Sequence, residues 1–337
     1  MKRILVTGAT GGLGGHAVDL LLERGCAVHA LGRDLRRGAR LQGLGASFTA
    51  IDLATVAEDA LRPVLQGVDA VWHCAARAAL WGRHADFMAD NCEATVKLAR
   101  ASAQAGVQRF VFVSTPAVYF DFTHRYEVPE HFRPMRYVNS YAYSKAMAEQ
   151  ELQRNDEHWP DMRVVVLRPR AIVGPYDQSL LPRLERLKRR AGGRLPLPRG
   201  GEVKLDLTYS ANVVDPMWLA TTRPGLERGA VFNITNHGPV RLCDALQMLA
   251  ESRAAPPRIV NVPARALDLA ARASELLARC TGRAPALTRY GIGVLSYDMT
   301  LCNERAKRLL GYAPRVRLQA ALAERGSWGS PWHACTR

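Results

Sequence analysis

Ile4-Leu5-Val6-Thr7-Gly8-Ala9-Thr10-Gly11-Gly12-Leu13-Gly14-Gly15 is the stretch that decides the fold. Its apolar beginning predicts a short strand, and residues 16–24, with apolar side chains on one face, predict a helix. The glycines between them are spaced Gly8-x-x-Gly11-x-x-Gly14. Glycine permits a tight turn with backbone close to a phosphate, and the amides at the start of a helix attract an anion. Strand, glycine turn and helix in this order predict a dinucleotide-binding site, the alternative being a flexible turn that binds nothing.

The composition is that of a globular protein. Of the 337 residues, 48% are hydrophobic and 23% charged, which suffices for a large core in one elaborated domain or two lobes. The seven cysteines are scattered and form no C-x-x-C pair, so we expect neither a disulfide framework nor a metal site. Because the sequence shows no signal-peptide pattern and no apolar run of bilayer length, we expect a cytoplasmic protein.

The net charge of +15 raises the question of an anionic partner. Part of the excess is local, because residues 183–199 contain seven basic side chains and one acidic side chain, Glu185. No aromatic residue is interleaved among them to stack on bases, so we expect no nucleic-acid partner. A solvated helix face, an acidic substrate, a phosphate-bearing carrier and anionic lipid remain open as explanations.

Apolar runs typical of buried strands recur along the chain, with helix-length segments between them. The runs lie at residues 27–31, 47–51, 70–74, 110–113 and 164–167, and the clearest helices at 91–105 and 144–155. This alternation predicts a parallel sheet covered by helices on both faces. We therefore expect an α/β protein with a doubly wound, Rossmann-type sheet that binds ligands at the carboxyl ends of its strands.

From residue 169 on, prolines interrupt the pattern. Residues 230–234 predict one more strand that returns to the sheet, and the remainder is expected to be mostly helical and to end near Arg325. We expect two parts. The nucleotide-binding domain comprises residues 1–169 plus 207–235, and a smaller, mostly helical substrate-binding lobe comprises residues 170–206 plus 236–330.

The end of the second predicted strand distinguishes the two nicotinamide cofactors. A carboxylate there would bind the adenosine ribose and repel a 2′-phosphate, whereas an arginine would bind that phosphate. Here Gly32 is followed by Arg33 and Asp34. We expect Arg33 to select NADPH, although a shift of one residue would place Asp34 at the ribose and favour NAD. The other cofactor contacts are expected from Gly8, Thr10, Gly11, Gly12, Leu13, Gly14, Leu53 and Asp52, the last with a helix N-cap as its alternative role.

The spacing Tyr141-x-x-x-Lys145 puts a phenol and an ammonium on one face of a helix. A free phenol has a pKa near ~10, and a neighbouring positive charge lowers that value. Tyr141 is then suited to act as general acid toward a ketone while a hydride arrives from the nicotinamide. Ser114 and Thr115 follow an apolar strand and offer hydroxyl groups to orient the substrate oxygen. Tyr143 lies only two residues from Lys145 and is expected to face elsewhere.

With these motifs the chain resembles the extended short-chain dehydrogenases/reductases, in the group that contains 3β-hydroxysteroid dehydrogenases and nucleotide-sugar epimerases. The likeness covers nearly the whole length and includes Leu167-Arg168-Pro169, Gly174-Pro175 and residues 305–312. The resemblance implies that Thr115, three residues before Val118, is the catalytic hydroxyl, although serine is commoner there. It further implies that Lys145 binds the cofactor ribose, that Asn91 shapes the active site, and that the cofactor is lined by Cys74, Ala75, Ala76 and Pro169.

A closer resemblance is to the bacterial 2-alkyl-3-oxoalkanoate reductases. It rests on Ala75-Ala76-Arg77, Trp81-Gly82, residues 114–118, Arg168-Pro169-Arg170, Asp177-Gln178 and residues 181–184. The resemblance implies an NADPH-dependent reductase of a hydrophobic β-keto acid or related ketone. Arg170 would bind the substrate carboxylate, or else form a salt bridge between the lobes. Trp81 and Tyr119 are further candidates for substrate contact, a place in the core being the alternative for Trp81.

Three other functions stay open. They are a nucleotide-sugar epimerase that holds NAD tightly, a 3β-hydroxysteroid dehydrogenase/isomerase, and a regulator that senses dinucleotides without turnover. The arginines after the second strand speak against the first, and the set Thr115, Tyr141 and Lys145 speaks against the last. Members of the family are often dimers, so the resemblance implies a homodimer. Residues 267–279 predict an amphipathic helix that closes the substrate lobe, or alternatively contacts a membrane surface or a partner enzyme.

Overall fold

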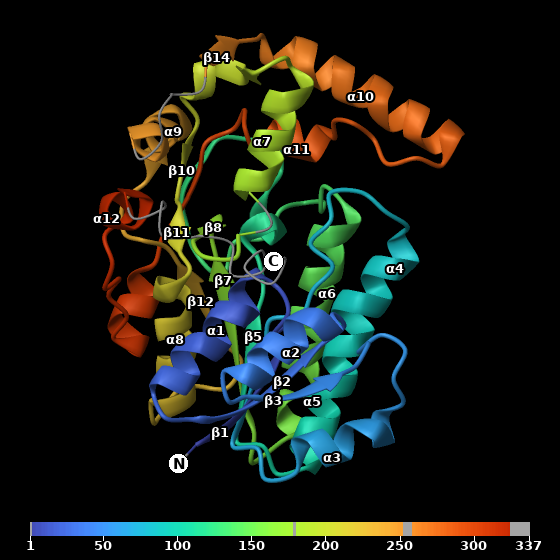
Figure 1. Ribbon diagram of the computed structural model, residues 1–337, viewed down its shortest axis with the longest axis vertical. Helices are drawn as coiled ribbons and strands as arrows, with labels where there is room; N and C mark the ends of the chain where they lie inside the picture. Colours follow the sequence, from blue (N-terminus) through green and yellow to red (C-terminus); the bar gives the residue numbers. More distant parts are fainter. Residues whose placement is uncertain (1, 178–179, 252–257, 324–337) are drawn as a thin grey trace.

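A parallel sheet of seven strands forms the centre of the computed structural model, which describes residues 2–177, 180–251 and 258–323 (Figure 1). Its strands lie in the order β12-β7-β5-β4-β1-β2-β3, each parallel to its neighbours. The order reverses at β1, and doubly wound sheets bind ligands at such a position. The bounds are β1 Arg3–Thr7, β2 Ala27–Gly32, β3 Ser47–Ala50, β4 Ala70–His73, β5 Arg109–Val113, β7 Arg163–Pro169 and β12 Ala230–Ile234.

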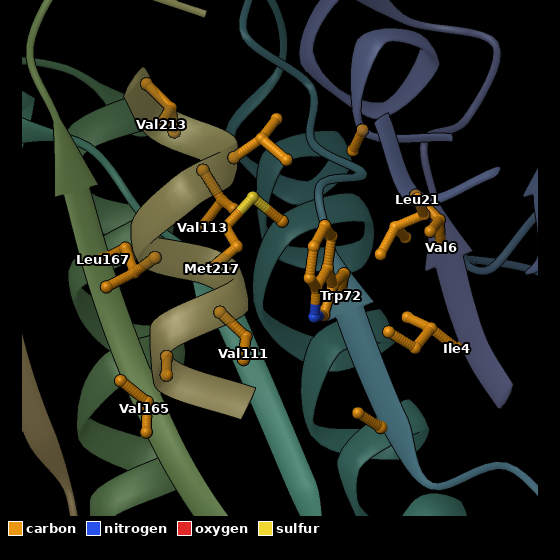
Figure 2. Packing of buried hydrophobic residues seen from close by; sticks show 14 of the residues in the cluster. Ile4, Val6, Leu21, Trp72, Val111, Val113, Val165, Leu167, Val213 and Met217 are labelled. Carbon is orange, nitrogen blue, oxygen red and sulfur yellow. The ribbon is translucent and has the colours of Figure 1, made fainter. Parts of the chain in front are cut away.

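Helices cover both faces of this sheet. One face packs against α1, α2 and α8, and the other against α3, α5 and α6. In the first of these layers, Trp72 of β4 lies between Leu21 of α1 and Met217 of α8 (Figure 2). Trp72 Nε1 also donates to Thr221 Oγ1 at 2.8 Å, which ties β4 to α8. The bounds are α1 Gly12–Glu23, α2 Leu35–Gly43, α3 Arg62–Leu65, α5 Ala94–Gln104, α6 Ser140–Asn155 and α8 Ala211–Thr222.

A second group of strands lies outside this sheet, and its members β10 and β14 are seen in the upper part of Figure 1. It contains a four-stranded sheet of order β13-β10-β15-β6 and the strand pairs β11-β8 and β14-β9. The strands are β6 Arg125–Val128, β8 Ile172–Val173, β9 Arg194–Leu197, β10 Lys204–Leu205, β11 Thr208–Tyr209, β13 Val240–Arg241, β14 Arg258–Asn261 and β15 Met299–Leu301. The remaining α-helices of the chain are α4 His84–Met88, α7 Leu180–Arg190, α9 Leu242–Glu251, α10 Ala264–Thr281, α11 Arg289–Gly293 and α12 Leu318–Ala323.

Six short helices of other types complete the described elements. Four are 3₁₀-helices, η1 Glu58–Leu61, η3 Pro116–Tyr119, η4 Asp156–His158 and η5 Pro198–Gly201. Two are π-helices, η2 Ala89–Glu93 and η6 Ala306–Leu310. None of the helices in the described ranges is both long and apolar enough to cross a membrane.

The predicted fold class is confirmed, and every strand predicted for the central sheet is present. The strand predicted at residues 230–234 has those bounds. The helix predicted at residues 91–105 is present, and its first turn belongs to the π-helix η2, which α5 follows directly. The helix predicted from residue 144 begins earlier, at Ser140, because the Asn139 side chain accepts a hydrogen bond from the Ala142 amide at 2.8 Å and caps it.

The division into two parts stays a prediction, and the packing crosses its boundaries. Leu310 and Tyr312, from the predicted substrate lobe, pack in the same apolar cluster as Ile4 of β1. Strand β6, from the predicted nucleotide-binding domain, lies at the edge of the four-stranded sheet. Several positions in the predictions lie outside the described residues, namely 252–257, 324–330, Gln178, Arg325 and Cys335.

Candidate active site

The glycine loop joins β1 to α1, where the strand order reverses. Gly8 has a φ of +64°, and a Cβ there would lie 2.7 Å from the Ala75 nitrogen. A Cβ on Gly14 would lie 2.3 Å from the Gly8 carbonyl oxygen, so both positions require glycine. Gly11 is the N-cap of α1, where no side chain caps the helix and the first turn contains no acidic residue. These amides, with the helix dipole, fit the pyrophosphate of a dinucleotide.

The other residues of the loop are held by close contacts. The Thr10 carbonyl accepts a hydrogen bond from the Arg37 guanidinium at 2.8 Å. A Cβ on Gly12 would lie 2.9 Å from the Tyr176 carbonyl oxygen, and Leu13 packs against the central core. A cofactor here would be contacted mainly by the backbone atoms of Thr10, Gly12 and Leu13. These contacts stay predictions.

The side chains of Arg33 and Asp34, which follow β2, have different surroundings. The Asp34 carboxylate is the N-cap of α2 and accepts from a backbone amide of that helix at 3.0 Å. Arg33 has a side chain that is 67% exposed and lies 3.5 Å from Asp52 Oδ2. Asp52 accepts from the backbone amide two residues on at 3.0 Å, and Leu53 is buried in the core. The guanidinium of Arg33 is thus accessible at the carboxyl end of β2, whereas the carboxylate of Asp34 is occupied.

The segment after β4 lies against the glycine loop. Thr7 Oγ1 contacts His73 Nδ1 at 2.7 Å and accepts from the Ala75 amide at 3.2 Å. Burial raises the pKa of the Cys74 thiol to about 12, although Lys145 lowers it, so this thiol stays protonated. The segment Cys74-Ala75-Ala76 therefore forms one wall of the predicted cofactor site, at the same sheet edge as the last residue of β7, Pro169.

Tyr141 lies in the first turn of α6, and its hydroxyl group lies close to the side chain of Thr115, which lowers its pKa. Thr115 Oγ1 is held in place because it also accepts from the Ala117 amide at 3.2 Å. Burial raises the pKa of Tyr141, against the lowering effects of Thr115 and of the positive charge of Arg183. A phenol that keeps its proton is suited to act as a general acid. Tyr143, as expected, faces elsewhere and is 38% exposed.

Lys145 lies one turn further along α6 and is only 1% exposed. Its Nζ donates to the Val113 carbonyl at 2.8 Å and lies 3.8 Å from the centre of the Phe112 ring. Burial lowers the pKa of Lys145 to about 7, although the charge of Glu149 raises it. The prediction that Lys145 lowers the pKa of Tyr141 is wrong for this structure, because its ammonium is directed at β5 and the cation acting on the phenol is Arg183.

The prediction of a catalytic role for Ser114 is contradicted. Its hydroxyl donates to Glu149, whose carboxylate also binds Arg168, with Arg168 Nε 2.9 Å from Glu149 Oε1. Glu149 and Arg168 are 3% and 0% exposed. Burial alone would raise the pKa of Glu149, but Arg168 and Ser114 hold it below its usual value. Ser114 therefore belongs to a buried ion pair that links α6 to β7. Because Glu149 and Arg168 lie on different elements, no spacing in the sequence indicates this pair.

Asn91 lies in the π-helix η2 and is fully buried. Its Nδ2 donates to Ser144 Oγ at 3.0 Å, and its Oδ1 accepts from the Arg77 amide at 2.7 Å. Asn91 thus connects the loop after β4 to α6 beside Lys145. Insertions of this helical type are frequent near functional sites, and a direct catalytic role of Asn91 stays a prediction.

The candidate substrate contacts differ in their surroundings. Tyr119 is wrong as a contact, because it is 0% exposed and its hydroxyl is used by Arg168 and by Asn233 Oδ1, the latter at 2.8 Å. Trp81 is half-buried and belongs to none of the apolar clusters formed by the described residues. Its neighbour Leu80 lies next to α11, and a substrate contact from Trp81 stays a prediction.

Arg170 follows β7, is 8% exposed, and its Nε has no hydrogen-bond partner among the described residues. Burial lowers its pKa, against the opposing effects of Tyr290 on α11 and of Asp206. Tyr141 in turn raises the pKa of Tyr290, and Arg183 on α7 interacts with both phenols. Arg183 and Tyr290 thus lie close to Tyr141, and Arg170 lies close to Tyr290. Sequence reasoning missed Arg183 and Tyr290 as site residues, because segments so far apart in the chain carry no spacing signal.

Comparisons with known proteins agree with this geometry. Residues 4–235 match the family described as the NAD dependent epimerase/dehydratase family. The chain is 36% identical over 327 residues to the 4-hydroxy-2-methyl-3-oxo-4-farnesyl-3,4-dihydroquinoline-1-oxide ketoreductase of Stigmatella aurantiaca, covering 95% of this chain and 94% of that protein. It is 34% identical over 335 residues to the 2-alkyl-3-oxoalkanoate reductase of Stenotrophomonas maltophilia, covering 95% and 97%.

Among solved structures, MoeE5 in complex with UDP-glucose and NAD shares the fold. The TM-score is 0.75 at 23% sequence identity, and the likeness covers 97% of this chain and 98% of that one. The family match spans most of the chain, the relatives named above carry reductase names, and the glycine loop fits a dinucleotide. The chain therefore belongs to the NAD dependent epimerase/dehydratase family, the extended short-chain dehydrogenases/reductases, and is an NAD(P)-dependent oxidoreductase.

Proposed function

We propose that this protein is an NADPH-dependent reductase of a hydrophobic β-keto acid or a related ketone, and that it works in reverse as an NADP-dependent alcohol dehydrogenase. The observation that carries the proposal is the surroundings of Tyr141. A phenol with a raised pKa lies close to Thr115 and to the charge of Arg183, and its neighbour Tyr290 interacts with Arg170. An acid at the reacting oxygen and cations for a carboxylate are what reduction of a keto acid requires.

Tyr141 supplies the proton in this proposal. The glycine loop would hold NADPH, which would supply a hydride for the ketone carbon when bound. The Tyr141 hydroxyl donates its proton to the ketone oxygen, and the Thr115 hydroxyl orients that oxygen through a second hydrogen bond. Because burial raises the pKa of the phenol, Tyr141 stays protonated and ready to donate at neutral pH. The charge of Arg183 stabilises the phenolate that remains.

Arg170 is our candidate for the carboxylate. A buried guanidinium is costly unless an anion or a set of acceptors pairs with it. Asp206 interacts with Arg170, but its Oδ2 accepts from the Leu301 amide at 2.8 Å, and burial raises its pKa to about 6. The Nε of Arg170 remains without a partner among the described residues. A substrate carboxylate would satisfy this donor and offset the burial of the charge.

NADPH is favoured over NADH by the arrangement after β2. Arg33 is accessible there, and the side chain of Asp34 caps α2. A 2′-phosphate at this position would meet the guanidinium of Arg33. The carboxylate of Asp34, which caps α2, would not bind the ribose.

The names of the relatives support a ketone as substrate. The second candidate function is that of a nucleotide-sugar epimerase that holds NAD tightly. The epimerase has in its favour the family description and the shared fold with MoeE5. A 3β-hydroxysteroid dehydrogenase/isomerase would also need Tyr141 to exchange a proton with its substrate. A regulator that only senses dinucleotides would not need a general acid at this position.

The test follows NADPH and NADH consumption with long-chain β-keto acids and, in parallel, with their methyl esters. We expect turnover with NADPH that falls about 10²–10⁴-fold in Tyr141→Phe, the range for loss of a general acid. Arg170→Met should lower kcat/KM for the acids by about 10- to 100-fold and leave the esters unchanged, because one charge-assisted hydrogen bond is lost. Arg62→Met, at a surface side chain that is 73% exposed, is the control.

Two results would contradict the proposal. An equal effect of Arg170→Met on acids and esters would remove the carboxylate assignment. No turnover with either cofactor, together with release of stoichiometric NAD on denaturation, would instead identify the epimerase.

A further inference from the structure

Helix α10 carries exposed leucines on the side that faces away from the protein. Leu269, Leu276 and Leu277 are 68%, 63% and 63% exposed. The opposite side of the helix is buried through Leu267 and Ala271, which pack on Ile292 of α11, and through Ala278. The apolar face predicted from the sequence is therefore only partly buried, because two of its residues, Ala270 and Leu277, are exposed to solvent.

The exposed apolar residues form a continuous stripe. An α-helix turns by about 100° per residue, so these residues cover roughly 120° of the surface of α10. We call them the α10 stripe, and its members are Ala266, Leu269, Ala270, Ala273, Leu276, Leu277 and Cys280. Singly exposed leucines are ordinary, but a stripe that runs the length of a helix is typical of a contact surface.

Positive charge borders the stripe along one edge. Arg265, Arg272 and Arg279 are spaced by seven residues, so they lie on one side of the helix, and all three are exposed. The acidic residues on the far side of this row are engaged. Asp268 pairs with Arg272 at 2.7 Å and with Arg289 at 3.1 Å, and Glu275 accepts from the Arg289 amide at 2.7 Å.

The end of α7 lies beside the loop that follows α10. Arg190 donates to the Ala286 carbonyl, in the loop that follows α10, at 2.8 Å. Figure 1 shows α7, α10 and α11 at the same end of the molecule. Lys188 is half-buried and Arg186, Arg189 and Arg194 are exposed, and they belong to the basic segment noted in the sequence.

We propose that the α10 stripe docks on the surface of an anionic lipid bilayer. An apolar stripe bordered by arginines lies in the plane of a membrane interface, with leucines among the acyl chains and guanidinium groups at the phosphates. The net charge of +15 and the row of arginines on α10 favour an anionic surface over a neutral one.

The position of α10 relates the docking surface to the candidate site. The buried side of α10 packs on α11, and Tyr290 of α11 interacts with Arg170 and Tyr141. A substrate with long alkyl arms would thus reach Tyr141 from the docked end of the molecule. This link rests on the proposed function, whereas the docking itself does not.

The test is co-sedimentation of the full chain with phosphatidylcholine vesicles that contain or lack phosphatidylglycerol. We expect binding to the anionic vesicles only, weakened by salt. Leu269→Ser/Leu276→Ser/Leu277→Ser should lower the partition coefficient by about tenfold or more, because three apolar side chains no longer enter the interface. The control is Leu35→Ser/Leu44→Ser, with leucines that are 69% and 47% exposed elsewhere.

A second variant separates charge from apolar contact. Arg265→Gln/Arg272→Gln/Arg279→Gln should weaken binding and reduce its salt dependence, whereas Arg62→Gln/Arg136→Gln/Arg154→Gln should not. Absence of vesicle binding, or equal binding by the leucine variant, would overturn the proposal. A change of oligomeric state in that variant without vesicle binding would assign the stripe to a second copy of the chain instead. Reduction of a short, water-soluble ketone, measured on the same variants, reports on the proposed function separately.

Discussion

Replacement of Lys145 by methionine should make the protein more stable while it removes activity. The ammonium of Lys145 is 1% exposed and is compensated by the charge of Glu149, by one hydrogen bond to Val113 and by the Phe112 ring. Burial lowers its pKa from 10.5 to about 7. At about 1.4 kcal/mol per pKa unit, keeping this group charged costs the folded state about 5 kcal/mol below pH 7.

The dependence on pH follows from the direction of this shift. Between pH 7 and 10.5 the unfolded chain holds more protons on Lys145 than the folded chain, so the free energy of unfolding rises with pH. The contribution of Lys145 to that rise is about 2 kcal/mol between pH 7 and pH 9. Methionine has no charge to bury, but it leaves the Val113 carbonyl without its donor, at a cost of about 1–3 kcal/mol. The net expectation at pH 7 is a variant more stable by about 2 kcal/mol.

Urea unfolding of the cofactor-free protein at pH 7, 8 and 9 tests this reasoning. The difference in unfolding free energy between wild type and Lys145→Met should shrink by about 2 kcal/mol across that range. Lys204→Met, at an exposed lysine, is the matched control and should show no such trend. A less stable Lys145→Met at pH 7, or a difference independent of pH, would refute the argument that burial of the ammonium is costly.

Two further variants probe the cofactor site and the core beneath it. Arg33→Gln should reduce the ratio of kcat/KM for NADPH to that for NADH by about 10- to 100-fold, since a charge-assisted hydrogen bond to the 2′-phosphate is lost; an unchanged ratio would assign cofactor selection to another residue. Glu149→Gln should lower the free energy of unfolding by about 3–5 kcal/mol, because Arg168 keeps its buried charge without a counterion. Urea unfolding of Glu149→Gln, compared with Ser114→Ala, which removes only a hydroxyl, measures that effect. Equal losses of unfolding free energy in the two variants would contradict the expectation.

Local patterns in the sequence predicted the elements that carry the chemistry. The glycine spacing, the apolar strands and the pair Tyr141/Lys145 act over a few residues, so they are legible without the fold. The place after β5 brings both Ser114 and Thr115 to the carboxyl edge of the sheet, and the family resemblance, not the local pattern, selected Thr115. The hydrogen bond of Lys145 could not be predicted from the sequence, because its acceptor, the Val113 carbonyl, lies on another element.

The sequence by itself determined a doubly wound sheet with a dinucleotide loop at its centre and a phenol on a helix beside it. These features depend on the periodicity of apolar residues and on the steric needs of glycine, both of which are local. Only the tertiary structure decided that Ser114 joins the Glu149–Arg168 pair, that Tyr119 is core, and that Asp34 caps a helix. It alone brought Arg183 and Tyr290 to Tyr141 and turned leucines of α10 to solvent. Such contacts join residues distant in the chain, so they depend on how helices and strands pack.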